Sequence, residues 1–122
     1  MRRFLLLLCG VAAAAAVFGA PLPQAARTEI DTLLSRLEAS SCTFNRNGTW
    51  YPATEAKSHL LRKLKYLEDR GLVQSTEQFI ELAGSGSSTT GKPYLVRCGT
   101  GAPVPSGPWL SSQLQALRAG SS

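Results

Sequence analysis

Several side chains that can bind an anion recur at helical spacing in the middle of the sequence. A helix over about residues 53–70 would place them on one flank of its apolar stripe, close to Arg62. The members of this group are His59, Lys63, Tyr66 and Arg70. Charged and neutral donors on one flank favour binding of a carboxylate or a phosphate. A half-buried His59 would titrate near neutral pH and make that binding pH-dependent.

A polar segment farther along the chain supplies further donors. Residues 84–91 (GSGSSTTG) have the composition of a flexible loop, and residues 93–98 (PYLVRC) that of a β-strand. The candidate ligand-binding residues from this region are Ser87, Ser88, Lys92 and Tyr94. The loop hydroxyls would donate hydrogen bonds to the ligand, and the lysines would neutralise its charge. The alternative is an ordinary solvated helix face, on which lysine stems cover apolar surface.

A small hydrolase is the second class of function that these residues allow. Ser85, Ser87 or Ser88 would be the nucleophile, with His59 as its base and Glu55 orienting the imidazole. This mechanism requires His59 to lie within hydrogen-bond distance of one of the serines. The sequence has no nucleophile elbow, and a Ser/Gly-rich loop holds a nucleophile poorly. We therefore predict no catalytic residue.

Metal and nucleotide sites are disfavoured by residue type and spacing. His59 is the single histidine of the chain, and Glu55, one turn before it, completes only two of the three or four ligands that a metal needs. Residues 86–92 match the start of a phosphate-binding loop, but Pro93 stands where a magnesium-binding Ser or Thr is required. The segment also leads into a strand, so it offers no helix N-terminus to a phosphate. No metal and no cofactor is predicted.

Residues 1–20 have the pattern of a secretory signal peptide. Two arginines precede an apolar run over residues 4–20, which ends at Pro21. Cleavage is expected near Gly19 or Ala20. A retained membrane anchor is the alternative, and it is disfavoured because 17 residues are at the short limit of a span.

The cysteines are consistent with export and predict one disulfide. Cys9 is no lipoprotein site, because a leucine precedes it where a small residue is needed, and it leaves with the signal peptide. The remaining pair, Cys42 and Cys98, is expected to form a disulfide in an oxidising compartment. The alternatives are two free thiols or one redox-active cysteine, although the chain has no CxxC motif.

Length and charge limit the class of protein further. The 122 residues allow one domain, and 43% hydrophobic with 17% charged residues is a globular composition. Loss of Arg2 and Arg3 leaves 11 of the 13 basic residues against 8 acidic ones, a formal charge of +3. This charge is compatible with anionic partners but does not indicate nucleic-acid binding. We predict no nucleic-acid partner and, after signal cleavage, no stable membrane span.

Periodicity and turn signals predict an α+β domain. Its boundaries are residues 28–118, with a leader at 21–27 and a frayed tail at 119–122. About four helices are expected to pack on a short antiparallel sheet of about three strands. The helices are expected at 24–40, at 53–70, after the capping box at Ser75 and from Pro108, and the strands at 42–44, 49–51 and 93–98. A hairpin turn is expected at Asn47-Gly48, where both positions favour positive φ.

Four blocks in fixed order resemble the YfeK-like proteins, small exported bacterial proteins classed as a domain of unknown function. The blocks are Phe44-x-Arg46-Asn47-Gly48, Glu55-Ala56-x-x-His59-Leu60-x-x-Lys63, Thr76-Glu77-Gln78-Phe79-Ile80 and Ser87-Ser88-x-Thr90-Gly91-Lys92-Pro93-Tyr94-x-Val96. The resemblance spans about residues 28–117. It implies a periplasmic location, and it implies no activity and no catalytic residue.

Taken together, the residues favour a non-catalytic periplasmic domain that binds a small anionic ligand or a protein partner of the envelope. The hydrolase is one alternative. The other is a structural or assembly protein of the cell envelope that docks its partner through an exposed Trp50 or Trp109. An apolar surface patch around either indole ring would favour this last class.

Overall fold

The structure, a computed structural model, describes residues 20–120. The predicted signal peptide therefore lies outside the described residues, except for Ala20. The elements in chain order are α1 (Gln24–Ala39), β1 (Thr43–Arg46), β2 (Thr49–Pro52), α2 (Ala53–Asp69), α3 (Thr76–Phe79), a π-helical segment η2 (Ile80–Gly84), β3 (Leu95–Arg97), β4 (Val104–Pro105) and α4 (Ser106–Gly120). The chain is an α+β domain, as the sequence predicts. No helix among residues 20–120 is long and apolar enough to cross a membrane.

The four strands form one antiparallel sheet in the order β2-β1-β3-β4. The predicted hairpin joins β1 to β2 through Asn47 and Gly48, which both have positive φ (54° and 90°). This is the backbone conformation that matches the twist of the flanking strands. The fourth strand adds to the three that the sequence predicts. It comprises two residues, and one of them, Pro105, lies opposite Leu95 at the edge of the sheet.

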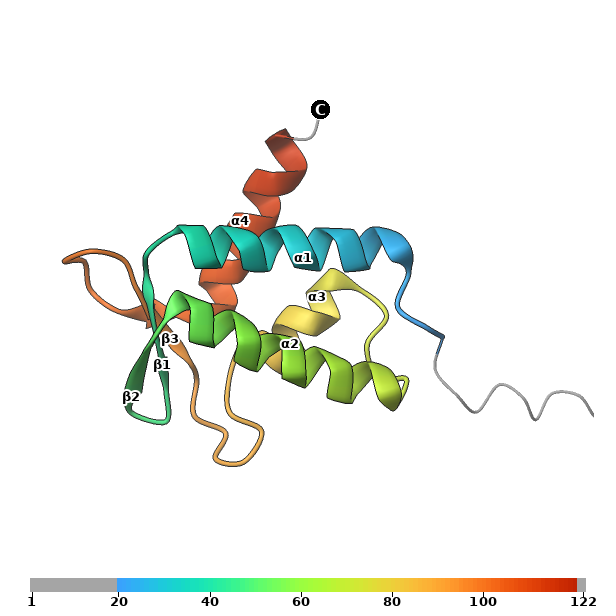
Figure 1. Cartoon of the computed structure of the whole chain (residues 1–122), viewed down its shortest axis with the longest axis horizontal. Coiled ribbons are helices and arrows are strands. Elements are labelled where there is room, and N and C mark those ends of the chain that lie inside the picture. Colours follow the sequence, from blue (N-terminus) through green and yellow to red (C-terminus); the bar gives the residue numbers. More distant parts are fainter. Residues whose placement is uncertain (1–19, 121–122) are drawn as a thin grey trace, which may run out of the picture.

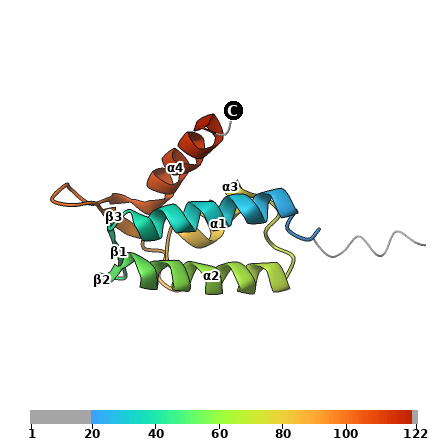
Figure 2. The same ribbon diagram turned by 45° about the horizontal axis from the view of Figure 1, so that its top comes forward.

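The two long helices, α1 and α2, contribute eight buried residues to the core. They lie side by side, with α3 and η2 against them, and the sheet closes one end of the pair (Figures 1 and 2). The apolar stripe of α1 is fully buried, and the stripe of α2 faces it. The buried residues of these two stripes are Ile30, Leu33, Leu34 and Leu37 of α1, and Ala53, Ala56, Leu60 and Leu64 of α2. The flank of α2 that carries His59 and Lys63 is thereby held next to the β-hairpin and to the segment that follows η2.

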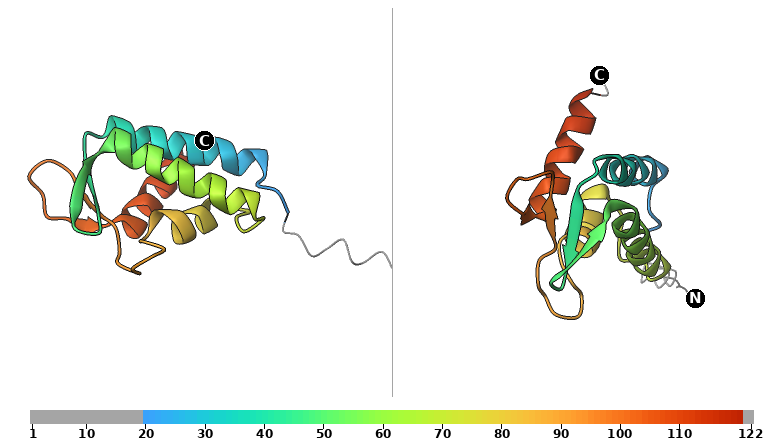
Figure 3. Two further views of the ribbon diagram at one scale, coloured as in Figure 1. Left: turned by 60° about the horizontal axis from the view of Figure 1, so that its bottom comes forward. Right: turned by 60° about the vertical axis from the view of Figure 1, so that its left-hand side comes forward.

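The terminal helix packs closely on the end of η2, and this contact fixes where the polar segment begins. Figure 3 shows α4 crossing the other elements at a steep angle. A Cβ on Gly84 would lie 2.7 Å from Leu110 Cδ1, so a larger residue here would require the Leu110 side chain to shift. The Ser106 hydroxyl donates to the Gly84 carbonyl oxygen. α4 itself continues through Gly120, two residues into the predicted tail, and residues 121–122 lie outside the described part.

A disulfide joins Cys42 to Cys98, as the sequence predicts. Cys42 immediately precedes β1 and Cys98 immediately follows β3, and these strands pair antiparallel with Thr43 opposite Arg97. The bond therefore ties two adjacent strand ends across 56 positions of the sequence. Cys42 is buried and Cys98 is an exposed residue.

Candidate functional site

The hydroxyl group of Tyr94 is the centre of a polar cluster below the hairpin. Its ring is 2% exposed and packs on Phe44, with 5.1 Å between the ring centroids. The backbone around it is fixed, because Tyr94 N–H donates to Ser85 O and Ser106 N–H donates to Tyr94 O. The hydroxyl points out of the core towards α2. Its oxygen lies 3.0 Å from His59 Nε2 and 3.0 Å from Lys63 Nζ. One core tyrosine thus connects the sheet to the predicted flank of α2.

Lys63 carries a half-buried positive charge. Its ammonium donates to Gly86 O (2.8 Å) and to the Tyr94 hydroxyl (3.0 Å), both neutral oxygens. Burial, with a contribution from the charge of Arg46, lowers the pKa of Lys63 to about 8. At neutral pH the ammonium is therefore still mainly protonated. Among residues 20–120 it has no carboxylate within ion-pair distance.

His59 is neutral at physiological pH. Burial lowers its pKa to about 4, helped by the positive charges of Arg46, Lys63 and Arg62. The expectation that it titrates near neutrality is therefore wrong, because solvent exclusion and three cations all oppose a fourth charge. Lys63 can only donate to the Tyr94 oxygen, and in the tautomer with unprotonated Nε2 the Tyr94 hydroxyl donates to His59. Nδ1 of the imidazole then carries the proton and forms no hydrogen bond with residues 20–120.

The loop after η2 is tied to the β-hairpin, which the sequence did not indicate. The Ser87 hydroxyl oxygen accepts from Thr89 N–H (3.2 Å), Thr90 N–H (3.1 Å) and Asn47 Nδ2 (3.4 Å). Thr90 Oγ1 donates to Asn47 Oδ1 at 2.8 Å. Ser87 is buried, and its own N–H donates to Lys92 O. The loop predicted to be flexible is thus held by hydrogen bonds within itself and to the hairpin.

Two adjoining hollows open beside this cluster. The first, called here the inner pocket, has a volume of about 240 Å³. It is lined by Arg46, Asn47, His59, Lys63, Ser87, Ser88, Thr89 and Tyr94. The second, the outer groove, has a volume of about 350 Å³ and runs between α2 and Leu82 of η2. It is lined by His59, Arg62, Lys63, Tyr66, Leu67, Leu82 and Ser88. A third hollow of about 130 Å³ lies on the other side of His59, next to Glu55 and Tyr51.

Most of the predicted ligand-binding residues come together here. Those that line the inner pocket are His59, Lys63, Ser87, Ser88 and Tyr94, and Tyr66 lines the outer groove. Arg70 is separate from them: its guanidinium stacks on Tyr66, 3.7 Å from the ring centroid, and donates to Tyr66 O. Lys92 is exposed and lines neither hollow.

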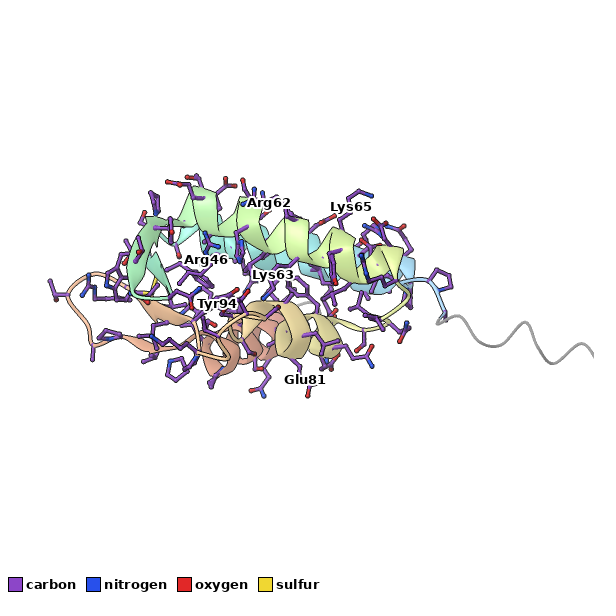
Figure 4. All side chains as sticks on the ribbon, turned by 90° about the horizontal axis from the view of Figure 1, so that it is seen from below. Arg46, Arg62, Lys63, Lys65, Glu81 and Tyr94 are labelled. Atoms are coloured by element: carbon purple, nitrogen blue, oxygen red, sulfur yellow. A yellow bond between two sulfur atoms is a disulfide. The ribbon has the colours of Figure 1, made fainter. Side chains whose placement is uncertain are left out.

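Arg46, Asn47 and Thr89 line the pocket but are not among the ligand-binding residues predicted from the sequence. Alternation along β1 could have found Arg46, because it stands two positions after buried Phe44 and so shares the face of the strand that points to Tyr94. The residue types around Asn47 predict a hairpin turn and give no sign of its contacts with the loop. In Figure 4, Arg46, Lys63 and Tyr94 gather between the hairpin, α2 and the loop, whereas Lys65 and Glu81 point away.

The cations around the pocket form no ion pair with the described residues, a property they share with Arg36, Arg70, Lys92 and Arg97. The ion pairs of the described residues use Arg27, Lys57, Lys65 and Arg118. Within residues 20–120, Arg46, Arg62 and Lys63 have no carboxylate within 4.0 Å. Arg46 and Lys63 therefore line the inner pocket, and Arg62 and Lys63 the outer groove, without an ion-pair partner from this part of the chain.

The contacts that the two alternative functions require are not formed. His59 Nε2 is paired with the Tyr94 hydroxyl, and the Ser85 hydroxyl donates to the backbone oxygen of Ile80. Trp50 is half-buried beneath the Arg97 guanidinium, and Trp109 packs against the core. The large apolar side chains that are exposed among residues 20–120 are Leu61, Tyr66, Leu72, Leu82 and Val104. No group of three metal-ligating side chains is present in the described range.

The buried imidazole predicts a loss of stability on mild acidification. A base with a lower pKa in the folded chain binds fewer protons when folded, so the free energy of unfolding falls as the pH drops from about 6.5 towards 4. We expect a loss of about 1–2 kcal/mol between pH 6.5 and 4.5, allowing for solvent screening. Glu29, whose pKa is lowered to about 2 chiefly by its hydrogen bond from Arg118, contributes mainly below that range.

Urea denaturation at a series of pH values measures this loss. His59→Gln retains an oxygen that can accept from the Tyr94 hydroxyl but does not titrate, so its stability should change little over the same range. Equal slopes for wild type and His59→Gln between pH 6.5 and 4.5 would contradict the assignment.

Comparison with known proteins agrees with the four sequence blocks. Residues 24–118 match the model described as "Family of unknown function (DUF5329)". A 66-residue segment is 42% identical to the uncharacterized protein YfeK of Salmonella typhimurium and covers 53% of this chain and 53% of that protein. The match thus spans about half the length of this curated relative. No solved structure matches the chain.

Proposed function

The chain belongs to the DUF5329 family, whose function is unknown, and we propose that it is a non-catalytic periplasmic domain that binds a small anionic ligand in the inner pocket. The observation that carries the proposal is the half-buried ammonium of Lys63, which has no carboxylate partner among residues 20–120. A buried charge destabilises the folded state unless it is paired. A site that binds an anion supplies the pair from outside.

The other groups around the pocket are donors suited to the same ligand. Arg46 adds a second unpaired cation from β1, and the neutral imidazole of His59 offers its Nδ1–H. Exposed Ser88 adds a hydroxyl at the rim that the inner pocket shares with the outer groove. Hydrogen bonds from charged donors to a carboxylate or phosphate are among the strongest in proteins. Tyr94 and Ser87 hold Lys63 and the loop in position, since their own hydroxyls are engaged with protein groups.

Export to the periplasm is part of the proposal. The signal-peptide pattern of residues 1–20 supports it, and so does the Cys42–Cys98 disulfide, a bond that persists in an oxidising compartment and is rare in the cytosol.

Lys63→Met separates binding from stability. We expect the unliganded variant to unfold within about 1 kcal/mol of wild type, because the lost hydrogen bonds are offset by removal of an unpaired, half-buried charge. Phosphate should raise the melting temperature of wild type but not of Lys63→Met, when chloride is used to keep the ionic strength constant. Differential scanning calorimetry with increasing phosphate measures both quantities.

Lys65→Met is the matched control. It removes the same charge from the same helix, but Lys65 is exposed, pairs with Asp69 and points away from the pocket. This variant should keep the full response to phosphate. Loss of the response in both variants would indicate that net charge alone attracts phosphate, and a strong loss of stability in Lys63→Met would indicate a structural role for the lysine.

A further inference from the structure

The outer groove differs in chemistry from the inner pocket that it adjoins. The two share His59, Lys63 and Ser88, so they meet at the unpaired ammonium. Away from that meeting point Arg62 is the one charged residue of the described lining, and the rest of the wall is mainly apolar: Tyr66 and Leu67 from α2, and Leu82 from η2. Tyr66 is 54% exposed and Leu82 is 42% exposed, although both are large apolar side chains.

The groove follows from the register of α2 and from the π-helical segment opposite. His59, Lys63, Tyr66 and Leu67 stand at i, i+4, i+7 and i+8 and therefore occupy one helix face. Cation and apolar surface thus follow each other along a single face, with Lys63 between the two hollows. A ligand lying along this face would contact the Lys63 charge at one end and the apolar side chains of the outer groove at the other.

We infer that the ligand of this site is a small amphipathic anion, with its anionic group at Lys63 and an unbranched apolar chain in the outer groove. This inference rests on the proposed function, because it assumes that the inner pocket binds the anion. The charge of Lys63 complements the head of such a molecule, and the exposed sides of Tyr66 and Leu82 gain contacts that water does not provide.

A free monomeric amphiphile fits the site better than a membrane surface does. The Lys63 ammonium is half-buried and is engaged with Gly86 O and the Tyr94 hydroxyl inside the fold. A flat array of lipid headgroups would contact exposed cations first, whereas a single small molecule can enter a hollow of about 240 Å³ beside this ammonium. The inference therefore commits to a soluble molecule with one head and one chain.

The inference is tested by isothermal titration calorimetry with a series of straight-chain carboxylates from acetate to octanoate. Each ligand is used below the concentration at which it forms micelles. Affinity for wild type should rise about two- to fourfold per added methylene until the groove is filled. Octanol, which has the chain without the charge, should bind at least tenfold more weakly than octanoate. Binding of octanol as tight as that of octanoate would overturn the inference.

Two leucine variants locate the chain. Leu82→Ser should flatten the dependence on chain length while leaving the affinity for acetate and phosphate unchanged. Leu61→Ser is the matched control, because Leu61 is 38% exposed and lines a different hollow, next to Asp31 and Lys65. It should retain the dependence. An equal effect of both variants would overturn the placement of the chain in the outer groove.

The results of these binding experiments distinguish failure of this inference from failure of the proposed function on which it rests. If phosphate and acetate bind through Lys63 and octanoate binds no better, the amphipathic ligand is wrong and anion binding stands. If no anion binds, the proposed function itself fails. Binding to vesicles containing phosphatidylglycerol, with no binding of monomeric octanoate, would overturn the inference in favour of a lipid surface.

Discussion

Reduction of the Cys42–Cys98 disulfide is expected to lower the free energy of unfolding by about 4 kcal/mol. The bond closes a loop of 56 positions, and closing such a loop removes many conformations from the unfolded chain. A domain of this size has a total stability of about 5–15 kcal/mol, so the bond supplies a large part of it. The melting temperature should fall by about 15–30 °C, since each kcal/mol corresponds to several degrees in a small domain.

Urea and thermal denaturation with and without a phosphine reductant measure the effect, which Cys42→Ala/Cys98→Ala should reproduce. The control is the double variant itself, whose stability should not respond to the reductant. Alkylation of the native protein should label the two cysteines only after reduction. Unchanged stability on reduction would show that β1 and β3 are held by packing and pairing alone.

The sequence predicts an element of the fold correctly wherever a local pattern, such as helical spacing, a turn pair or a capping box, determines that element. The buried stripe of α1 is the set Ile30, Leu33, Leu34 and Leu37, which recurs at helical spacing. Asn47-Gly48 specifies its turn because both residues tolerate positive φ. The Ser75 hydroxyl accepts from Gln78 N–H, as the capping box predicts.

The features that the sequence did not predict depend on partners distant in the chain. β4 is two residues long and includes a proline, so it has no strand pattern of its own and forms only because β3 offers a free edge. Residues 84–91 have the composition of a mobile loop, and their order comes from Asn47 in the hairpin.

The candidate site was only partly predictable from the sequence, because it too depends on residues that are distant in the chain. Helical spacing brought His59 and Lys63 together, but it also included Arg70, because spacing does not show where a neighbouring element ends. The predicted titration of His59 near neutral pH is wrong because its pKa depends on burial and on the charge of Arg46, which lies on another element. Tertiary contacts therefore decide both which residues face the pocket and which of them are charged.

Replacing Tyr94 with alanine is expected to lower the free energy of unfolding by about 4 kcal/mol. The ring is fully buried between the sheet and α2, and its loss would leave a cavity against Phe44. Tyr94→Phe keeps the ring and removes only the hydroxyl, so it should cost about 1 kcal/mol. Tyr66→Ala is the control on an exposed tyrosine, and it should change stability by less than about 0.5 kcal/mol. Equilibrium unfolding in urea measures all three.

The phenylalanine variant also tests whether the cluster serves the ligand or the fold. The Tyr94 hydroxyl donates to His59 Nε2 in the tautomer in which that nitrogen is unprotonated, and so favours the neutral imidazole; its removal should raise the pKa of His59, which NMR titration of the imidazole measures. Lys63 would lose one of its two neutral acceptors and keep Gly86 O, so its charge would be less well held at the pocket. Phosphate binding should weaken while the fold persists.

If Tyr94→Phe instead destabilises the domain as strongly as Tyr94→Ala does, the hydroxyl network is needed for folding. The pairing of His59 and Lys63 with Tyr94 then no longer supports a site built for an anion.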